Sequence, residues 1–170
     1  MAHASLPARF CRHLASDHGS VRRAFPEAVL SRLEAMIGAG EKSHRGQVRF
    51  AVEPALPLTR VLSRVTPRER AIEVFALLRI WDTEENCGVL VYLLLADRSV
   101  EIVADRGIHR RVGSEAWSAV CRKMEAAFRR GRFGEGVEAG LAEINALLAE
   151  HYPRDGGEAS NELPDRPVVL

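Results

Sequence analysis

The chain has few cysteines, almost no lysine and no long apolar segment. The first and the last of these each exclude a class of protein. Its three cysteines, Cys11, Cys87 and Cys121, are odd in number and widely spaced, which excludes a disulfide framework and a zinc-finger pattern. We expect unpaired, mostly buried thiols in the reducing cytoplasm. The uncharged run from Val89 to Ala96 is far shorter than the ~20 residues of a membrane-spanning helix. The first ten residues lack the apolar stretch of a secretory signal, so no transmembrane or leader segment is predicted.

Neither sign of charge is in excess, because 24 Lys and Arg residues are balanced by 23 Asp and Glu residues, which gives a net charge of +1. This balance gives no reason to expect a nucleic-acid partner. Arginine supplies nearly all of the positive charge, since Lys42 and Lys123 are the only lysines. The 170 residues, 46% of them hydrophobic, suffice for a globular domain with a substantial core.

The apolar run Val89–Ala96 is typical of a strand buried on both faces at the centre of a sheet. Residues 96–99 form a tight turn before a second apolar run, Val100–Ala104, which predicts an antiparallel hairpin. Residues Gln47–Glu53 alternate between apolar and polar and predict another strand. A helix lies between this strand and the central one, so the two should run parallel through a right-handed crossover.

Helical patterns surround these strands. Thr66 and Glu69 form a capping box that begins a helix running to about Ile80. In the first helix, Leu6, Phe10 and Leu14 share one face. The expected helices span residues 4–18, 26–38, 67–80, 114–128 and 135–152.

These elements predict a three-layer α/β/α sandwich with a small mixed sheet and helices on both faces. We divide the chain into an N-terminal helical segment packing on the domain (1–44), the α/β domain (45–153) and a disordered C-terminal tail (154–170) rich in Pro, Gly and Asp. Within the tail, residues 168–170 are either a frayed apolar end or a ligand for a strand-adding domain.

The strand directions bring several acidic side chains to one edge of the sheet. One loop enters the central strand there and another leaves the antiparallel strand. Their oxygen atoms are ligands suited to a hard cation, so calcium is the candidate cofactor, while a solvated acidic loop paired with nearby arginines is the alternative. The candidate metal ligands are Asp82, Glu84, Glu85, Asn86 and Asp105.

Other polar groups give weaker signals. We expect Asp97 to shape the hairpin turn and Arg98 to pair with Glu53 or Glu101. His44 and His109 lie near the acidic edge without a metal-ligand spacing. A basic helix end offers either favourable helix-dipole contacts or a patch for anionic lipid or RNA. It consists of Arg122, Lys123, Arg129, Arg130 and Arg132. We identify no catalytic nucleophile.

The order of motifs from Asn86 to Gly136 resembles the TPM domain, a family of plant thylakoid lumen proteins, bacterial YgcG-like proteins and an animal membrane modulator. The resemblance covers residues 45–153. Family-matched positions are Gly88, Asp97, Arg98 and Gly107. Residues 86–88 read Asn-Cys-Gly where the family commonly has Asp-Asn-Gly, and residues 105–107 read Asp-Arg-Gly where it has Gly-aromatic-Gly. The resemblance implies an α/β/α sandwich, with acid phosphatase activity and calcium binding in some members.

Two functions follow as hypotheses. The first is a soluble TPM-like binding or accessory module with an unknown protein partner, in the neighbourhood of membrane-associated proteins. The second is a calcium- or magnesium-assisted acid phosphatase, in which a cation at the acidic edge polarises the phosphoryl group. We favour the first, because the residues supply no complete catalytic set.

Overall fold

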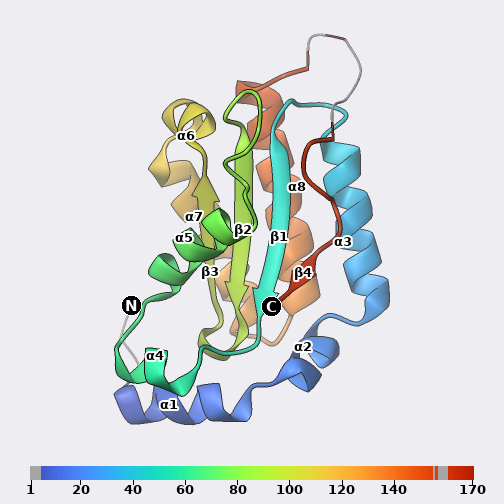
Figure 1. The fold of residues 1–170 in the computed structure, drawn as a ribbon. Coiled ribbons are helices and arrows are strands. Elements are labelled where there is room, and N and C mark those ends of the chain that lie inside the picture. The colour runs from blue at the N-terminus through green and yellow to red at the C-terminus, as the bar shows by residue number, and fades with distance from the viewer. Residues whose placement is uncertain (1–4, 155, 157–160) are drawn as a thin grey trace.

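The computed structural model describes residues 5–154, 156 and 161–170, and its centre is a mixed sheet with the spatial order β3-β2-β1-β4 (Figure 1). Strands β1 (Gln47–Glu53) and β2 (Gly88–Leu94) run parallel, and β3 (Ser99–Ala104) returns antiparallel to β2. Strand β4 (Val168–Val169) lies parallel to β1 on its other side. The predicted arrangement of the first three strands is therefore confirmed.

Strand β2 lies inside the sheet because its side chains are apolar on both faces. All of its residues are buried. Val48 of β1 pairs with Val89, and Val91 pairs with Ile102 of β3. A short 3₁₀ turn (η1, Leu95–Asp97) ends at Arg98, whose φ of 51° lies in the left-handed region, and reverses the chain into β3.

Helices cover both faces of the sheet, which confirms the three-layer α/β/α sandwich (Figure 1). On one face, Phe50 and Leu93 pack in a core with residues of α3, α6, α7 and α8. On the other, Leu90 and Tyr92 pack with residues of α1, α4 and α5. The helices are α1 (Leu6–Ala15), α2 (His18–Ala24), α3 (Glu27–Gly40), α4 (Leu58–Leu62), α5 (Pro67–Leu77), α6 (Arg106–Val112), α7 (Ser114–Phe128) and α8 (Phe133–His151).

The predicted capping box at the start of α5 is present. Glu69 N donates to Thr66 Oγ1 at 3.1 Å, and Thr66 N donates to Glu69 Oε2 at 2.7 Å. Two backbone N–H groups that have no acceptor within the helix therefore have side-chain acceptors. Within the described part of the chain, no helix combines the length and apolarity that crossing a bilayer requires.

The C-terminal segment differs from the prediction of a disordered tail for residues 154–170. Residues 161–170 lie along β1, where Leu170 N donates to Val52 O at 3.0 Å and the Arg49 guanidinium donates to carbonyls of Pro164 and Arg166. Composition alone suggested disorder, but Leu163 is 7% exposed and joins the core. Residues 155 and 157–160 lie outside the described part of the chain. The predicted division at residue 45 stays a prediction.

Buried polar side chains join α3, β1 and the C-terminal segment. Glu41, at the end of α3, is 4% exposed and accepts a hydrogen bond from Val48 N at 2.8 Å. Gln47 Oε1 accepts from the amides of Glu162 and Leu163. Burial of Glu41 raises its pKa to about 7, with the nearby Asp165 carboxylate adding to the rise.

We expect the free energy of unfolding to fall between about pH 4.5, the ordinary Glu value, and about pH 7. The folded protein holds a proton on Glu41 in this window and the unfolded chain does not, so this contribution is complete below it and lost above it. Glu41→Gln keeps an acceptor for Val48 N and should flatten the dependence, measured by urea unfolding across this range. The exposed Glu150→Gln is the control, and an unchanged slope in Glu41→Gln would contradict the assignment.

Candidate anion-binding site

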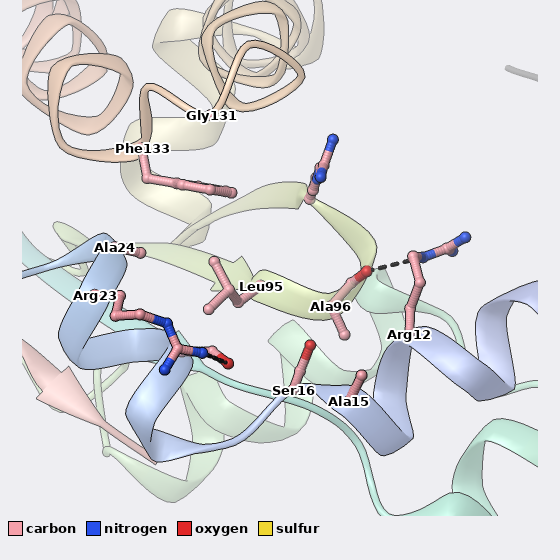
Figure 2. Close-up of a pocket in the computed structure, with 11 residues that line it drawn as sticks. Arg12, Ala15, Ser16, Arg23, Ala24, Leu95, Ala96, Gly131 and Phe133 are labelled. Atoms are coloured by element: carbon pink, nitrogen blue, oxygen red, sulfur yellow. Dashed lines mark hydrogen bonds between the residues drawn. The ribbon is translucent and has the colours of Figure 1, made fainter.

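A pocket of about 420 Å³ lies beyond the carboxyl ends of β1 and β2, beside the β2–β3 turn (Figure 2). Ligands of open α/β sheets bind preferentially outside this end of the strands. Four parts of the chain line the pocket: the end of α1, helix α2, the turn itself and the turn between α7 and α8. The lining residues are Arg12, Ala15, Ser16, Ser20, Arg23, Ala24, Leu95, Ala96, Arg98, Gly131 and Phe133.

The Asp97 carboxylate joins α1 to the β2–β3 turn. Its side chain is 9% exposed, and Arg9 donates to it from Nε at 2.9 Å. Arg12 Nη2 lies 3.2 Å from Asp97 Oδ1. Because two guanidinium groups face one carboxylate, this end of α1 keeps an excess of positive charge.

His13 supports the same carboxylate from inside the protein. Its side chain is fully buried, and its Nδ1 accepts a hydrogen bond from Leu56 N at 3.0 Å. With Nδ1 as acceptor, the neutral ring carries its proton on Nε2, which lies 3.2 Å from Asp97 Oδ1. Burial alone would raise the pKa of Asp97, but the His13 contact and the Arg9 guanidinium hold it well below its usual range.

Three arginines from separate elements line the pocket. Arg12 comes from α1 and donates from Nε to Ala96 O at 3.0 Å, the contact drawn in Figure 2. Arg23 comes from α2, where its Nη2 donates to Ser20 Oγ at 2.9 Å. The third arginine, Arg98, is exposed at the tip of the β2–β3 turn. Of the residues that the structure describes, those lining the pocket include no carboxylate.

This set of donors is suited to an anion. Guanidinium groups bind phosphate and carboxylate through paired N–H bonds, and the Ser16 and Ser20 hydroxyls can add O–H donors. Leu95 and Phe133 supply an apolar wall (Figure 2). The Phe133 ring is stacked on Phe128, with centroids 5.4 Å apart, which fixes the α7–α8 turn against the core.

The predicted pairing of Arg98 with Glu53 or Glu101 is wrong. Glu53 is buried and binds Arg70 through two hydrogen bonds of 2.8 and 3.1 Å, and it accepts from Tyr92 Oη at 2.6 Å. Glu101 pairs instead with Arg68 at 3.6 Å. Since α5 supplies these arginines, Arg98 is left to face the pocket.

The candidate metal ligands lie at the opposite edge, where separate partners hold most of them. Asp82 pairs with Arg79 at 2.7 Å, and Glu85 pairs with Arg45 at 2.8 Å. Among residues 5–154, 156 and 161–170, no three His, Cys, Asp or Glu side chains form a group that could hold a metal ion. This part of the chain does not supply a cation's ligand set, and the calcium site stays a prediction.

The other candidates at this edge have structural contacts. Asp105 Oδ1 accepts from Arg106 N at 2.6 Å and caps α6, while its Oδ2 is buried without a hydrogen-bond partner among the described residues. Glu84 N donates to Glu162 Oε2 at 2.8 Å, so this loop holds the C-terminal segment. Asn86, with a φ of 52°, turns the chain into β2.

The four family-matched residues divide between the two edges. A Cβ at Gly88 would collide with the carbonyl oxygen of Ile80, and one at Gly107 would lie 2.7 Å from Asn86 O, so both glycines permit close backbone approach. Arg98 lines the pocket, and Asp97 lies beside it, bound to Arg9 and Arg12. His44 is buried between Gly46 O and the Asn145 side chain.

Sequence reasoning missed the residues that the N-terminal helices contribute. Arg9 and Asp97 are 88 positions apart, and no local pattern links them. The available signal was the arginine-rich composition of residues 9–23, which lies outside the segment that resembles the family.

Comparisons with known proteins agree with this architecture. A family model described as "TPM domain" matches residues 23–147. The BA42 protein of the psychrophilic bacterium Bizionia argentinensis has a similar solved structure, with a TM-score of 0.75 and 23% identity, covering 86% of this chain and 95% of that one. The N-terminal domain of a P. gingivalis protein is similar with a TM-score of 0.57 and 17% identity, covering 72% of this chain and 76% of that one. No curated protein matches the chain significantly.

We expect Asp97→Asn to lower the free energy of unfolding at pH 7 by about 3 kcal/mol, because partly buried arginines would then face a neutral amide. The folded-state pKa of Asp97 is depressed, so its contribution is complete above the ordinary Asp value of 3.8 and is lost progressively below it. Urea unfolding should therefore show the two proteins converging in acid. Asp82→Asn, at an exposed ion pair, is the control and should change stability by less than about 1 kcal/mol.

Proposed function

The chain belongs to the TPM domain family, and from this premise we propose that it is a binding module that captures an anionic group of its partner in the arginine-lined pocket. One observation carries the proposal: Arg12, Arg23 and Arg98 come from three separate elements to one pocket without a lining carboxylate. Arg12 is ion-paired with Asp97, whereas Arg23 and Arg98 have no ion pair among the described residues. Guanidinium groups gathered in this way favour phosphate or carboxylate ligands.

The construction of the pocket also favours binding over chemistry. Arg12 is held by Asp97 and Ala96 O, and Arg23 by Ser20, so both donors have fixed positions before a ligand arrives. Preorganised donors reduce the entropy that binding costs. Among the described residues, the lining includes no histidine, cysteine or carboxylate that could act as a base or a nucleophile. The proposed partner is a protein or assembly that carries an anionic group, in the neighbourhood of membranes.

We expect inorganic phosphate to bind the full chain at low ionic strength, measured by amide shifts in NMR titrations. Arg98→Gln and Arg23→Gln should each weaken binding about tenfold, the equivalent of about 1.4 kcal/mol for a charged hydrogen bond. The exposed Arg22→Gln on the same helix is the matched control, because Arg22 does not line the pocket. Equal weakening by Arg22→Gln, or shifts confined to the acidic edge, would refute the proposal.

The alternative is a metal-assisted acid phosphatase centred on the acidic edge, and it has one favouring observation. The buried Asp105 Oδ2 has no hydrogen-bond partner among the described residues and is free to bind a ligand. The neighbouring acids do not complete a ligand set in this part of the chain. We therefore derive no metal-assisted step.

With para-nitrophenyl phosphate as substrate, we expect no turnover above the protein-free blank, with or without calcium, magnesium or manganese. A binding pocket without a base or nucleophile gives no route to hydrolysis. Turnover that Asp105→Asn and Glu85→Gln abolish would establish the phosphatase instead. Turnover that persists in both variants would show that the acidic edge is not the site of hydrolysis and would contradict this alternative.

A further inference from the structure

The pocket lies at one end of the molecule, where several exposed arginines gather from different elements. Helices α1 and α2, the β2–β3 turn and the α7–α8 turn meet at the lower end of Figure 1. Gly131, between Arg130 and Arg132, lines the pocket. The basic end of α7 predicted from the sequence therefore lies next to the arginines of α1 and α2. We call this surface the basic end. Arg12, Arg23 and Arg98 line its pocket, Arg22 precedes Arg23 on α2, and Arg129 and Arg130 follow the end of α7.

The acidic side chains near the basic end are already engaged. Asp97 is bound by Arg9 and Arg12. Asp17 accepts from Ser20 N at 2.8 Å and caps α2. Glu125 is 7% exposed and lies 3.6 Å from Arg129. Although the whole chain carries a net charge of only +1, the six arginines of the basic end outnumber these three carboxylates, of which Asp17 is itself exposed.

Two exposed leucines lie on α1 and α4 outside the pocket lining. Leu6 and Phe10 of α1 pack on the core, but Leu14, next along the same helical face, is 67% exposed. Leu62 ends α4, which packs against α1, and is 57% exposed. Aliphatic side chains beside arginines are typical of surfaces that lie in the headgroup region of a membrane.

The same features disfavour single-stranded RNA as the partner. Bases bind to such surfaces by stacking on accessible aromatic rings. Phe133 is the aromatic residue of the pocket lining, and its ring is already packed against Phe128 and Phe25, with centroids 5.4 and 6.4 Å apart. No described aromatic side chain of the lining is left for stacking.

We propose that the basic end docks on bilayers containing anionic lipid, with a lipid phosphate in the arginine pocket and Leu14 and Leu62 in the headgroup region. This inference rests on the proposed function and names its ligand class. It places the arginines where the negative surface potential of the membrane adds to the pocket's own affinity.

Sedimentation of the full chain with vesicles tests this docking. We expect binding to phosphatidylcholine vesicles that contain phosphatidylglycerol and none to phosphatidylcholine alone. Arg98→Gln and Arg22→Gln should each weaken vesicle binding roughly fivefold, because each removes one charge near the anionic surface. Leu14→Ser should weaken it at unchanged charge and leave phosphate affinity intact. Arg110→Gln, exposed on α6 at the opposite end, is the charge-matched control.

Arg22→Gln separates this inference from the proposed function, because it should weaken vesicle binding and spare phosphate binding. Phosphate binding without vesicle binding would overturn the docking and leave the pocket's function standing. Equal weakening by Arg110→Gln and Arg98→Gln would overturn it as non-specific attraction. Tighter binding to single-stranded RNA than to the vesicles would also overturn it, and circular dichroism would show that each variant is folded.

Discussion

The buried carboxylate of Asp97 is the interaction on which the arrangement of the candidate site depends. It lies at the turn between β2 and β3 and binds Arg9, Arg12 and His13, which all come from α1. A desolvated carboxylate is stable only with such partners, so the turn and the helix hold each other in place. Without this anchor, α1 would lose its ion pairs to the turn and keep only hydrogen bonds such as that from Arg12 Nε to Ala96 O, so this wall of the pocket would be held less firmly.

The sheet was predictable because its information is local. The uncharged run at Val89–Ala96, the alternation at Gln47–Glu53 and the Thr66 capping box each lie within one element, and each appears as expected. The parallel pairing of β1 and β2 then follows from chain connectivity. What these patterns could not give is the identity of side chains that meet across the fold.

The candidate site shows that limit. Asp97 and Arg98 were placed correctly at the turn, but their partners were not, because Arg70 satisfies Glu53 and Arg68 pairs with Glu101. Because these two arginines of α5 occupy Glu53 and Glu101, neither carboxylate pairs with Arg98. The C-terminal segment was missed for a related reason: its Pro- and Asp-rich composition resembles a linker, and its order comes from Arg49 and Gln47, more than a hundred positions away.

The pairing of that segment with β1 has a further consequence. β1 would otherwise be an edge strand, with a row of unpaired N–H and C=O groups beside apolar side chains. Strand β4 pairs with Ala51 and Val52 of β1, and Leu170 N donates to Val52 O, so the C-terminal segment takes the outer place on this side of the sheet. A chain shortened by these ten residues would lose Leu163 from its core and expose the edge of β1, which would favour intermolecular β-aggregation as protein concentration rises.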